Sequence, residues 1–254
     1  MKHLLLLCLL LLPPVGHAEP ILRADYRERP PEMQALDNQP SGPLISILDT
    51  AATRIGSRIE WRYAPFVRSL EDLKSGRVDL VPRVLFTDER KAYVHFLPAI
   101  GTQHKSIRFI VRPGREASLH SYADLRGEWV IGAKRGTAYF DPFDGDGLIS
   151  KVLATDDYVL AGMFRAGRLD ALAVLDREAI EAQFRKIGFS DYSYADYQYE
   201  QSIGNYYGAS LLLYQGAKQV IYDRLASELR RMRESGEIVS IYRRYGVAPP
   251  ATTE

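Results

Sequence analysis

The sequence contains one pattern twice, as LEDLKSGRVDL at residues 70–80 and as AGMFRAGRLDA at residues 161–171. Each copy reads as the end of a helix, then glycine, arginine, an apolar residue and aspartate, and then an apolar strand. Glycine suits a helix end because it adopts the left-handed backbone conformation without steric cost. The two copies lie too far apart for a solenoid repeat and indicate two similar α/β lobes, with chance similarity as the alternative.

Helix and strand patterns alternate on both sides of these segments, which favours an α/β fold with largely parallel strands. Apolar residues at helical spacing and the positions of capping residues predict the helices, and short apolar runs predict the strands. The expected helices are 44–55, 69–75, 155–166, 176–187 and 217–234, and the expected strands are 78–81, 129–131, 169–175 and 209–214.

Tyrosines are dense between residues 192 and 207. The alternate spacing of Tyr192 with Tyr194, and of Tyr197 with Tyr199, predicts a strand with one aromatic face. These tyrosines either pack on the lobe surface or form an exposed surface that binds a partner.

The N-terminus has the parts of a secretory signal peptide. A basic start is followed by the apolar run Leu4–Leu12 and by the small residues Gly16 and Ala18. We expect cleavage after Ala18, and a buried N-terminal helix is the alternative. The only cysteine lies within this segment, so the mature chain has none, and we expect an exported protein of the periplasm without disulfides.

The composition argues against several classes of protein. The chain has 33 basic and 32 acidic residues, and this balance does not suit a general nucleic-acid or anionic-membrane binder. The histidines lack metal-ligand spacing, and neither a nucleophile elbow nor a P-loop is present. The sequence therefore predicts no metal, no cofactor and no nucleic-acid partner.

The order and spacing of several short motifs resemble the bacterial extracellular solute-binding proteins, family 3, which serve polar amino-acid ABC transporters. The motifs run through nearly the whole mature chain. They are PP at 30–31, GRVDL at 76–80, TDER at 87–90, VHFLP at 94–98, DLRG at 124–127, GT at 136–137, GRLDA at 167–171 and SGEI at 235–238, the last followed by Tyr242 and Tyr245-Gly246.

This resemblance implies a two-lobed periplasmic-binding-protein-like fold of type II with two crossover strands. The first lobe would contain residues 19–101 and 206–254, and the second lobe residues 102–205. Ligands of such proteins bind between the lobes, and the hinge closes on them.

We expect Arg90 to be the main ligand contact. It lies three residues after Thr87, a residue type that caps helix N-termini. A guanidinium forms a bidentate pair with a carboxylate, which gives orientation as well as energy. In the resembled family the arginine of the T-x-x-R pattern holds the α-carboxylate of the ligand. A surface ion pair with Asp88 or Glu89 is the alternative.

Gly136-Thr137 follows a strand of the second lobe, where a turn can direct backbone N–H groups and a hydroxyl at the same carboxylate. Arg135 and Lys134 add positive charge beside it. In relatives that bind α-amino acids, an acidic residue after the next strand pairs with the ligand ammonium. Counting along the family pattern places Leu175 at that position, so Asp176 is either this contact or only the N-cap of the following helix.

The first lobe departs from the family pattern. Where relatives have an aromatic before the first proline, this chain has Arg29, with Tyr26 nearby, and PRVLF stands before the T-x-x-R motif. The arginines at positions 29, 68, 83, 90 and 135 together predict a cationic cleft, which suits a ligand with more than one anionic group or one without an ammonium. Solvent-facing positions are the alternative for Arg29 and Arg68. The predicted ligand contacts are Tyr26, Arg68, Arg83, Arg90, Arg135, Thr137 and Asp176.

The sequence thus predicts a monomeric periplasmic protein that captures a small carboxylate-bearing ligand and delivers it to an ABC transporter permease. Two alternatives stay open. An exported enzyme like the cyclohexadienyl dehydratases would use Glu178 or Glu181 as a general acid. A ligand sensor would report occupancy to a membrane receptor.

Overall fold

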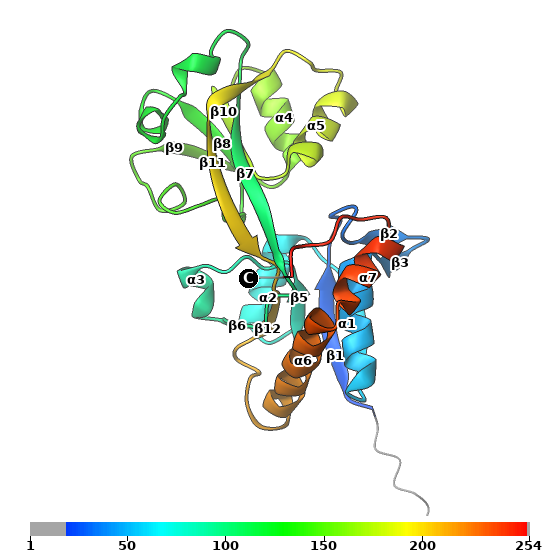
Figure 1. Ribbon diagram of the computed structural model, residues 1–254. Helices are drawn as coiled ribbons and strands as arrows, with labels where there is room; N and C mark the ends of the chain where they lie inside the picture. The colour runs from blue at the N-terminus through cyan, green and yellow to red at the C-terminus, as the bar shows by residue number, and fades with distance from the viewer. Residues whose placement is uncertain (1–18, 253–254) are drawn as a thin grey trace, which may run out of the picture.

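The computed structural model describes residues 19–252, so the predicted signal peptide lies outside the described residues. Figure 1 shows two α/β lobes, one above the other, joined by two long strands. None of the helices within residues 19–252 is long and apolar enough to cross a membrane. The chain has the two-lobed α/β architecture that its sequence predicts.

The first lobe is built on a five-stranded sheet with the order β4-β1-β5-β12-β6. β1 runs parallel to both of its neighbours, whereas β12 is antiparallel to β5 and β6. The strands are β1 (Ile21–Tyr26), β4 (Arg58–Tyr63), β5 (Leu80–Pro82), β6 (Val94–Phe96) and β12 (Tyr207–Ser210), and a separate hairpin contains β2 (Gln34–Leu36) and β3 (Gln39–Ser41).

Helices pack on both faces of this sheet. The larger core cluster joins apolar side chains of β1 to those of α1, α6 and α7, and a smaller cluster forms under α2. The helices of this lobe are α1 (Pro43–Arg54), α2 (Phe66–Lys74), α3 (Asp88–Lys91), α6 (Gly216–Glu234) and α7 (Glu237–Arg244).

The second lobe has a sheet with the order β11-β7-β10-β8-β9. Its central strand β10 is buried on both faces, because Ala171 and Ala173 enter one core cluster while Leu172 and Val174 enter another. The elements are β7 (Thr102–Val111), β8 (Val130–Lys134), β9 (Ser150–Ala154), β10 (Ala171–Val174), β11 (Ser193–Gly204), α4 (Asp157–Arg165), α5 (Arg177–Lys186) and the 3₁₀ turns η1 (Glu116–Ser118) and η2 (Tyr122–Arg126).

The repeated sequence segment forms the same helix end and the same hydrogen bonds to a neighbouring strand in both lobes. Both of its glycines have a φ of 71°, the left-handed conformation that ends α2 and α4. In the first lobe the backbone N–H of Asp79 donates to the Arg23 carbonyl (2.8 Å), and the Asp79 carboxylate accepts from the Arg23 N–H (3.0 Å). In the second lobe Asp170 makes the same reciprocal pair with Val130, at 2.9 and 2.8 Å. Each copy therefore joins two parallel neighbouring strands of its lobe, β1 with β5 and β8 with β10, by the same pair of hydrogen bonds.

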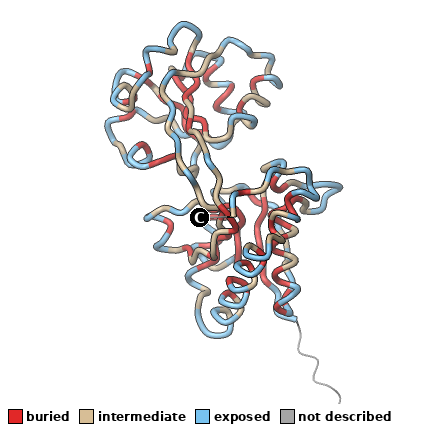
Figure 2. The backbone as a smooth tube through the Cα atoms, viewed as in Figure 1, coloured by how far each residue is buried: buried red, intermediate tan, exposed pale blue. Residues whose placement is uncertain are grey.

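β7 and β11 connect the lobes. They pair as antiparallel strands from Thr102 opposite Gly204 to Val111 opposite Ser193. Figure 2 shows buried residues gathered within each lobe, whereas the segments between the lobes are mostly half-buried. The first sheet takes its strands from residues 21–96 and 207–210, and the second from residues 102–204. The lobe limits stay a prediction.

Two strand predictions need correction. The run 209–214 is not one strand, because β12 ends at Ser210 and the chain turns at residues 211–213, where Leu212 is 57% exposed. An apolar run of strand length cannot reveal this turn.

The tyrosines between residues 192 and 199 do not share one aromatic face, although each alternating pair lies on one side of the sheet. A register shift between Tyr194 and Gln198 inserts an irregularity into the strand. Tyr192 packs with Phe184 on one side of the sheet, whereas Tyr199 stacks on Phe140 on the other side, because an odd number of positions separates the two tyrosine pairs. The tyrosines from 192 to 199 belong to the packing of the second lobe, whereas Tyr206 and Tyr207 pack in the first lobe.

Candidate functional site

A cavity of about 290 Å³ lies between the two lobes. Its walls come from segments that follow parallel strands, which end at one edge of each sheet. Arg27 follows β1 and Arg83 follows β5 in the first lobe, while Arg135 follows β8 and Asp176 lies beyond β10 in the second. Ligand sites of open α/β sheets prefer this position outside the carboxyl ends of the strands. The charged residues that line the cavity are Arg27, Glu28, Arg29, Arg83, Arg90, Lys134, Arg135, Asp156, Asp157 and Asp176.

Arg27 forms the centre of the first-lobe wall. Its guanidinium donates to the carbonyls of Pro82 (3.1 Å) and Arg83 (3.2 Å) and stacks on the Phe66 ring, 4.1 Å from the centroid. These contacts fix the plane of the guanidinium but provide no negative charge to balance it.

Arg90 links the two lobes. Thr87 caps α3 as predicted, since its hydroxyl accepts from the Arg90 N–H (3.2 Å). The Arg90 guanidinium donates to the Leu85 carbonyl (2.8 Å) and, across the cleft, to the Gly136 carbonyl (2.7 Å). A guanidinium has five N–H donors, so donors are left for a ligand.

Arg83 is the most deeply buried of these cations, with a side chain only 3% exposed. Its backbone is left-handed (φ 61°), which turns the side chain toward the base of the cleft. Nη2 donates to Gln103 on β7 (2.7 Å), and Nε lies 3.4 Å from a Glu32 carboxylate oxygen. Nε and Nη1 have no hydrogen-bond partner within the described residues.

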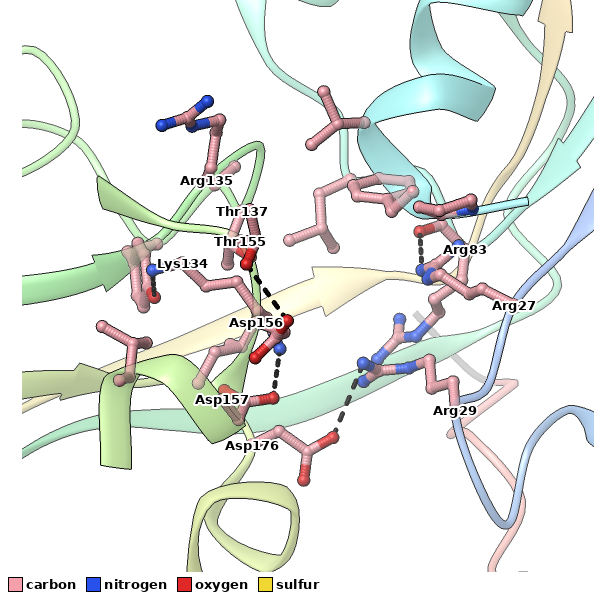
Figure 3. A pocket seen from close by; sticks show the side chains of 18 of the residues that line it. Arg27, Arg29, Arg83, Lys134, Arg135, Thr137, Thr155, Asp156, Asp157 and Asp176 are labelled. Atoms are coloured by element: carbon pink, nitrogen blue, oxygen red, sulfur yellow. Dashed lines mark hydrogen bonds and ion pairs between the residues drawn. The ribbon is translucent and has the colours of Figure 1, made fainter. Parts of the chain in front are cut away.

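Arg29 bridges the lobes near the same place. Its Nε donates to Glu32 in the first lobe (2.9 Å), and its Nη1 lies 3.5 Å from Asp176 in the second lobe. Asp176 also caps α5, because its other carboxylate oxygen accepts from the Ala179 N–H (3.4 Å). Figure 3 shows Arg29 and Asp176 reaching toward each other from opposite walls.

The second-lobe wall is mainly acidic. Lys134 forms an ion pair with Asp157 (2.7 Å). Asp156 caps α4 by accepting from the Val159 N–H (2.9 Å) and also accepts from the Thr155 hydroxyl (3.1 Å). This wall therefore offers carboxylates that already have partners within the protein.

Burial changes the pKa of the first-lobe cations. The pKa of Arg27 is lowered well below its ordinary value by burial and by the neighbouring charges of Arg29 and Arg83. Burial likewise lowers the pKa of Arg83 and of Arg90. Arginine stays protonated in proteins, so these lowered values mean that the site holds positive charge at a cost in free energy, which a bound anion would reduce.

Five of the seven predicted contacts line the cavity, and two do not. The five that line it are Arg83, Arg90, Arg135, Thr137 and Asp176. The side chain of Arg135 is exposed, and Figure 3 shows its guanidinium directed away from the centre of the cavity. Tyr26 is buried in the first-lobe core, where it packs against Trp61 and Tyr63. Arg68 pairs with Asp72 on α2, with its side chain 60% exposed.

Several residues that line the cavity were not predicted from the sequence as ligand contacts. Arg27, Phe66 and Asp156 have no motif of their own, and Lys134 was noted only as added charge. Their common signal is position, since each lies at or within a few residues of the end of a parallel strand. The described residues contain no cluster of His, Cys, Asp or Glu with metal-binding geometry.

A comparison with protein families identifies the chain. The model of the bacterial extracellular solute-binding proteins, family 3, matches residues 22–248. The chain belongs to this family. The resemblance read from the sequence motifs is confirmed, and the protein is a ligand-binding protein of the solute-binding type.

Solved structures with the same fold support the two-lobed architecture. A histidine kinase sensor domain with similarity to periplasmic binding proteins has a TM-score of 0.69 at 19% identity, covering 91% of this chain and 98% of that chain. A mutant of ArgBP from T. maritima has a TM-score of 0.67 at 17% identity, covering 89% of this chain and 95% of that chain. An amino acid ABC transporter substrate-binding protein from Streptococcus pneumoniae, bound to L-arginine, has a TM-score of 0.66 at 20% identity, covering 89% of this chain and 94% of that chain. A comparison with curated proteins found no match.

Proposed function

We propose that the protein captures a small carboxylate-bearing ligand between its lobes, closes around it by bending at β7 and β11, and delivers it to an ABC transporter permease. The observation that carries this proposal is Arg90, which lines the interlobe cavity and hydrogen-bonds across the cleft to Gly136. We further propose that the protein is exported to the periplasm after cleavage behind Ala18 and acts there as a monomer.

The geometry supports capture by closure. Arg90 and Arg29 each belong to the first lobe and contact the second, so their contacts depend on the closed arrangement. A carboxylate that received N–H groups from Arg90 would join the same network and add free energy to closure. Hinge closure around a ligand is an established mode of switching in periplasmic binding proteins.

We propose binding without catalysis. Glu178 and Glu181, the candidate general acids, lie on α5 and do not line the cavity. Burial raises the pKa of Glu181, but hydrogen bonds from Arg177 and Tyr194 outweigh burial and lower it overall. A carboxyl with a lowered pKa is ionised at neutral pH and is a poor proton donor. Formation of product from prephenate or arogenate would contradict this part of the proposal.

A sensory role is the second candidate. The histidine kinase sensor domain among the similar structures favours it, because closure would serve a membrane receptor as well as a permease. Permease and ATPase genes beside this gene would support transport, whereas a kinase or cyclase gene would support sensing.

Thermal unfolding tests the binding proposal. A library of amino acids, dicarboxylates, opines and aromatic acids is added to the purified protein, to Arg90→Ala and to Arg68→Ala. A ligand at 100 times its dissociation constant stabilises the folded state by about 2.7 kcal/mol, which gives a clear rise of the midpoint. We expect one carboxylate class to produce this rise in the native protein and in Arg68→Ala, and Arg90→Ala to abolish it. If no ligand raises the midpoint, or if Arg90→Ala responds like the native protein, the proposal fails.

A further inference from the structure

The acidic groups of the cavity already have donors of the protein itself as partners. Glu28 of the first lobe accepts from the Ala35 N–H (2.8 Å). Asp157 pairs with Lys134, and Asp176 faces Arg29. Asp156 lies at the N-terminus of α4, where its two carboxylate oxygens accept from Val159 and Thr155. A ligand ammonium at Asp176 would have to displace Arg29.

Arg29 is held firmly in that position. Its Nε donates to Glu32, which is largely buried and also accepts from Gln103 on the crossover strand β7 (3.2 Å). Burial raises the pKa of Glu32, but the charges of Arg83 and Arg29 outweigh burial and lower it overall, so Glu32 remains ionised behind Arg29. The guanidinium of Arg29 thus stands where a ligand amine would have to stand.

The basic groups of the first lobe show the opposite situation. Arg27 and Arg90 donate to backbone carbonyls and form no ion pair within the described residues. Both guanidinium carbons lie near the Phe66 ring, at 4.1 and 5.6 Å from its centroid. Arg83 adds a third guanidinium, which forms an ion pair with Glu32 (3.4 Å) but keeps two nitrogens without a hydrogen-bond partner among the described residues. The cavity therefore has an excess of positive charge, all on one wall.

We propose that the ligand carries two anionic groups and needs no ammonium, as in a dicarboxylate of about four to six carbons. This inference rests on the proposed function and narrows its ligand class. Arg90 would hold one carboxylate and Arg27 the other, because both line the cavity and flank the same ring. The volume of about 290 Å³ lies just below the usual range for ligand sites, about 300–1,000 Å³, which favours a small ligand of this size.

Isothermal titration calorimetry with four ligands of equal chain length separates the effect of a second carboxylate from the effect of an ammonium. Pentanoate has one carboxylate, glutarate has two, norvaline adds an ammonium to pentanoate, and glutamate adds one to glutarate. We expect glutarate to bind at least tenfold more tightly than pentanoate, and the ammonium to weaken binding or leave it unchanged. Succinate and adipate, titrated in the same way, cover the neighbouring lengths.

Variants assign the second carboxylate to its residue. We expect Arg27→Gln to reduce glutarate affinity to that of pentanoate while pentanoate affinity changes less than threefold, and Arg27→Lys to give an intermediate value. Arg90→Gln is expected to weaken both ligands. Arg68→Gln, at an arginine outside the cavity, is the matched control and should bind like the native protein.

The outcomes distinguish the two proposals. If pentanoate or norvaline binds through Arg90 and a second carboxylate adds nothing at any length, the dianion inference is overturned while the proposed function stands. Tighter binding of norvaline than of pentanoate, lost in Asp156→Asn or Asp176→Asn, would likewise overturn it in favour of an amino acid. If none of these ligands binds and the carboxylate library also fails, both proposals are refuted.

Discussion

The repeated Gly-Arg-apolar-Asp segment provides a matched pair of substitutions, Asp79→Ala and Asp170→Ala. Both aspartates make the same reciprocal pair with a neighbouring strand. Alanine keeps the backbone N–H bond of this pair, so both variants lose only the bond that the carboxylate accepts from the strand N–H. The environments differ, since the Asp79 side chain is fully buried and that of Asp170 is 40% exposed. The difference between the two variants therefore isolates the contribution of the buried carboxylate.

The structure allows an estimate of the two losses. Besides the Arg23 backbone, Asp79 accepts from the Arg23 guanidinium (3.1 Å), the Tyr222 hydroxyl (3.0 Å) and the Lys218 ammonium. A buried group left without its partner costs about 1–3 kcal/mol, whereas Lys218 and the Arg23 guanidinium reach solvent and are rehydrated. We expect Asp79→Ala to lower the free energy of unfolding by about 3–4 kcal/mol and Asp170→Ala by about 1 kcal/mol.

Urea unfolding followed by tryptophan fluorescence measures both losses separately, because each lobe contains one of the two tryptophans. Trp61 reports on the first lobe in a Trp129→Phe background, and Trp129 reports on the second in a Trp61→Phe background. Equal losses for the two variants would refute the argument, since they would show that the buried contacts of Asp79 add nothing to the one carboxylate–backbone bond that both aspartates share.

The pH dependence adds a second check on the same variant. Burial raises the pKa of Asp79, but hydrogen bonds from Lys218 and Arg23 outweigh burial and hold the pKa below its ordinary value. A lowered pKa means that the carboxylate stabilises the fold above its unfolded pKa of about 3.9, and that this stabilisation is lost as the pH falls through the folded value. The difference between the native protein and Asp79→Ala should therefore shrink below about pH 4.

Two further predictions concern closure of the cleft. Arg29→Gln removes the ion pair with Asp176, and because partly exposed ion pairs contribute about 0.2–1 kcal/mol, the ligand-free equilibrium should shift toward the open form by up to about fivefold. Small-angle X-ray scattering should then give a larger radius of gyration, and an identical profile would count against the role of this pair. Gly136→Ala places a Cβ 3.0 Å from the Val67 methyl of the opposite lobe and strains a backbone with a φ of 74°, so ligand affinity should fall several-fold. Val67→Ala should restore part of the affinity in calorimetry, and a failure to restore it would mean that the loss comes from strain within the second lobe.

Much of the local structure could be predicted from sequence because it depends on residues a few positions apart. The glycines of the repeated segment end helices in both lobes, and Thr87 caps α3 as its spacing from Arg90 indicates. Asp176 illustrates the limit of this reasoning. The sequence left a choice between helix cap and cavity residue, and the structure gives Asp176 both positions at once.

The composition of the cavity wall depended on the register of the sheets. Arg27 and Arg83 meet because they follow β1 and β5, which are parallel neighbours. Arg83 was predicted from its place before the T-x-x-R motif, whereas no local pattern marks Arg27. Tyr26 is one residue earlier and lies on the buried side of β1 with Leu22 and Ala24, so it enters the core instead.

The sequence by itself determined the lobes, the repeated turn and the family of this protein, since these rest on periodicity, caps and motif order. Only the tertiary structure decided which charges neutralise each other. Arg29 meets Asp176 across the cleft and Arg68 meets Asp72 on its own helix. Arg27 and Arg90 face the cavity and form no ion pair with a carboxylate of residues 19–252. The physical reason is that ion pairing falls off over a few ångströms, and the distances between these groups are set by how two lobes far apart in sequence come together.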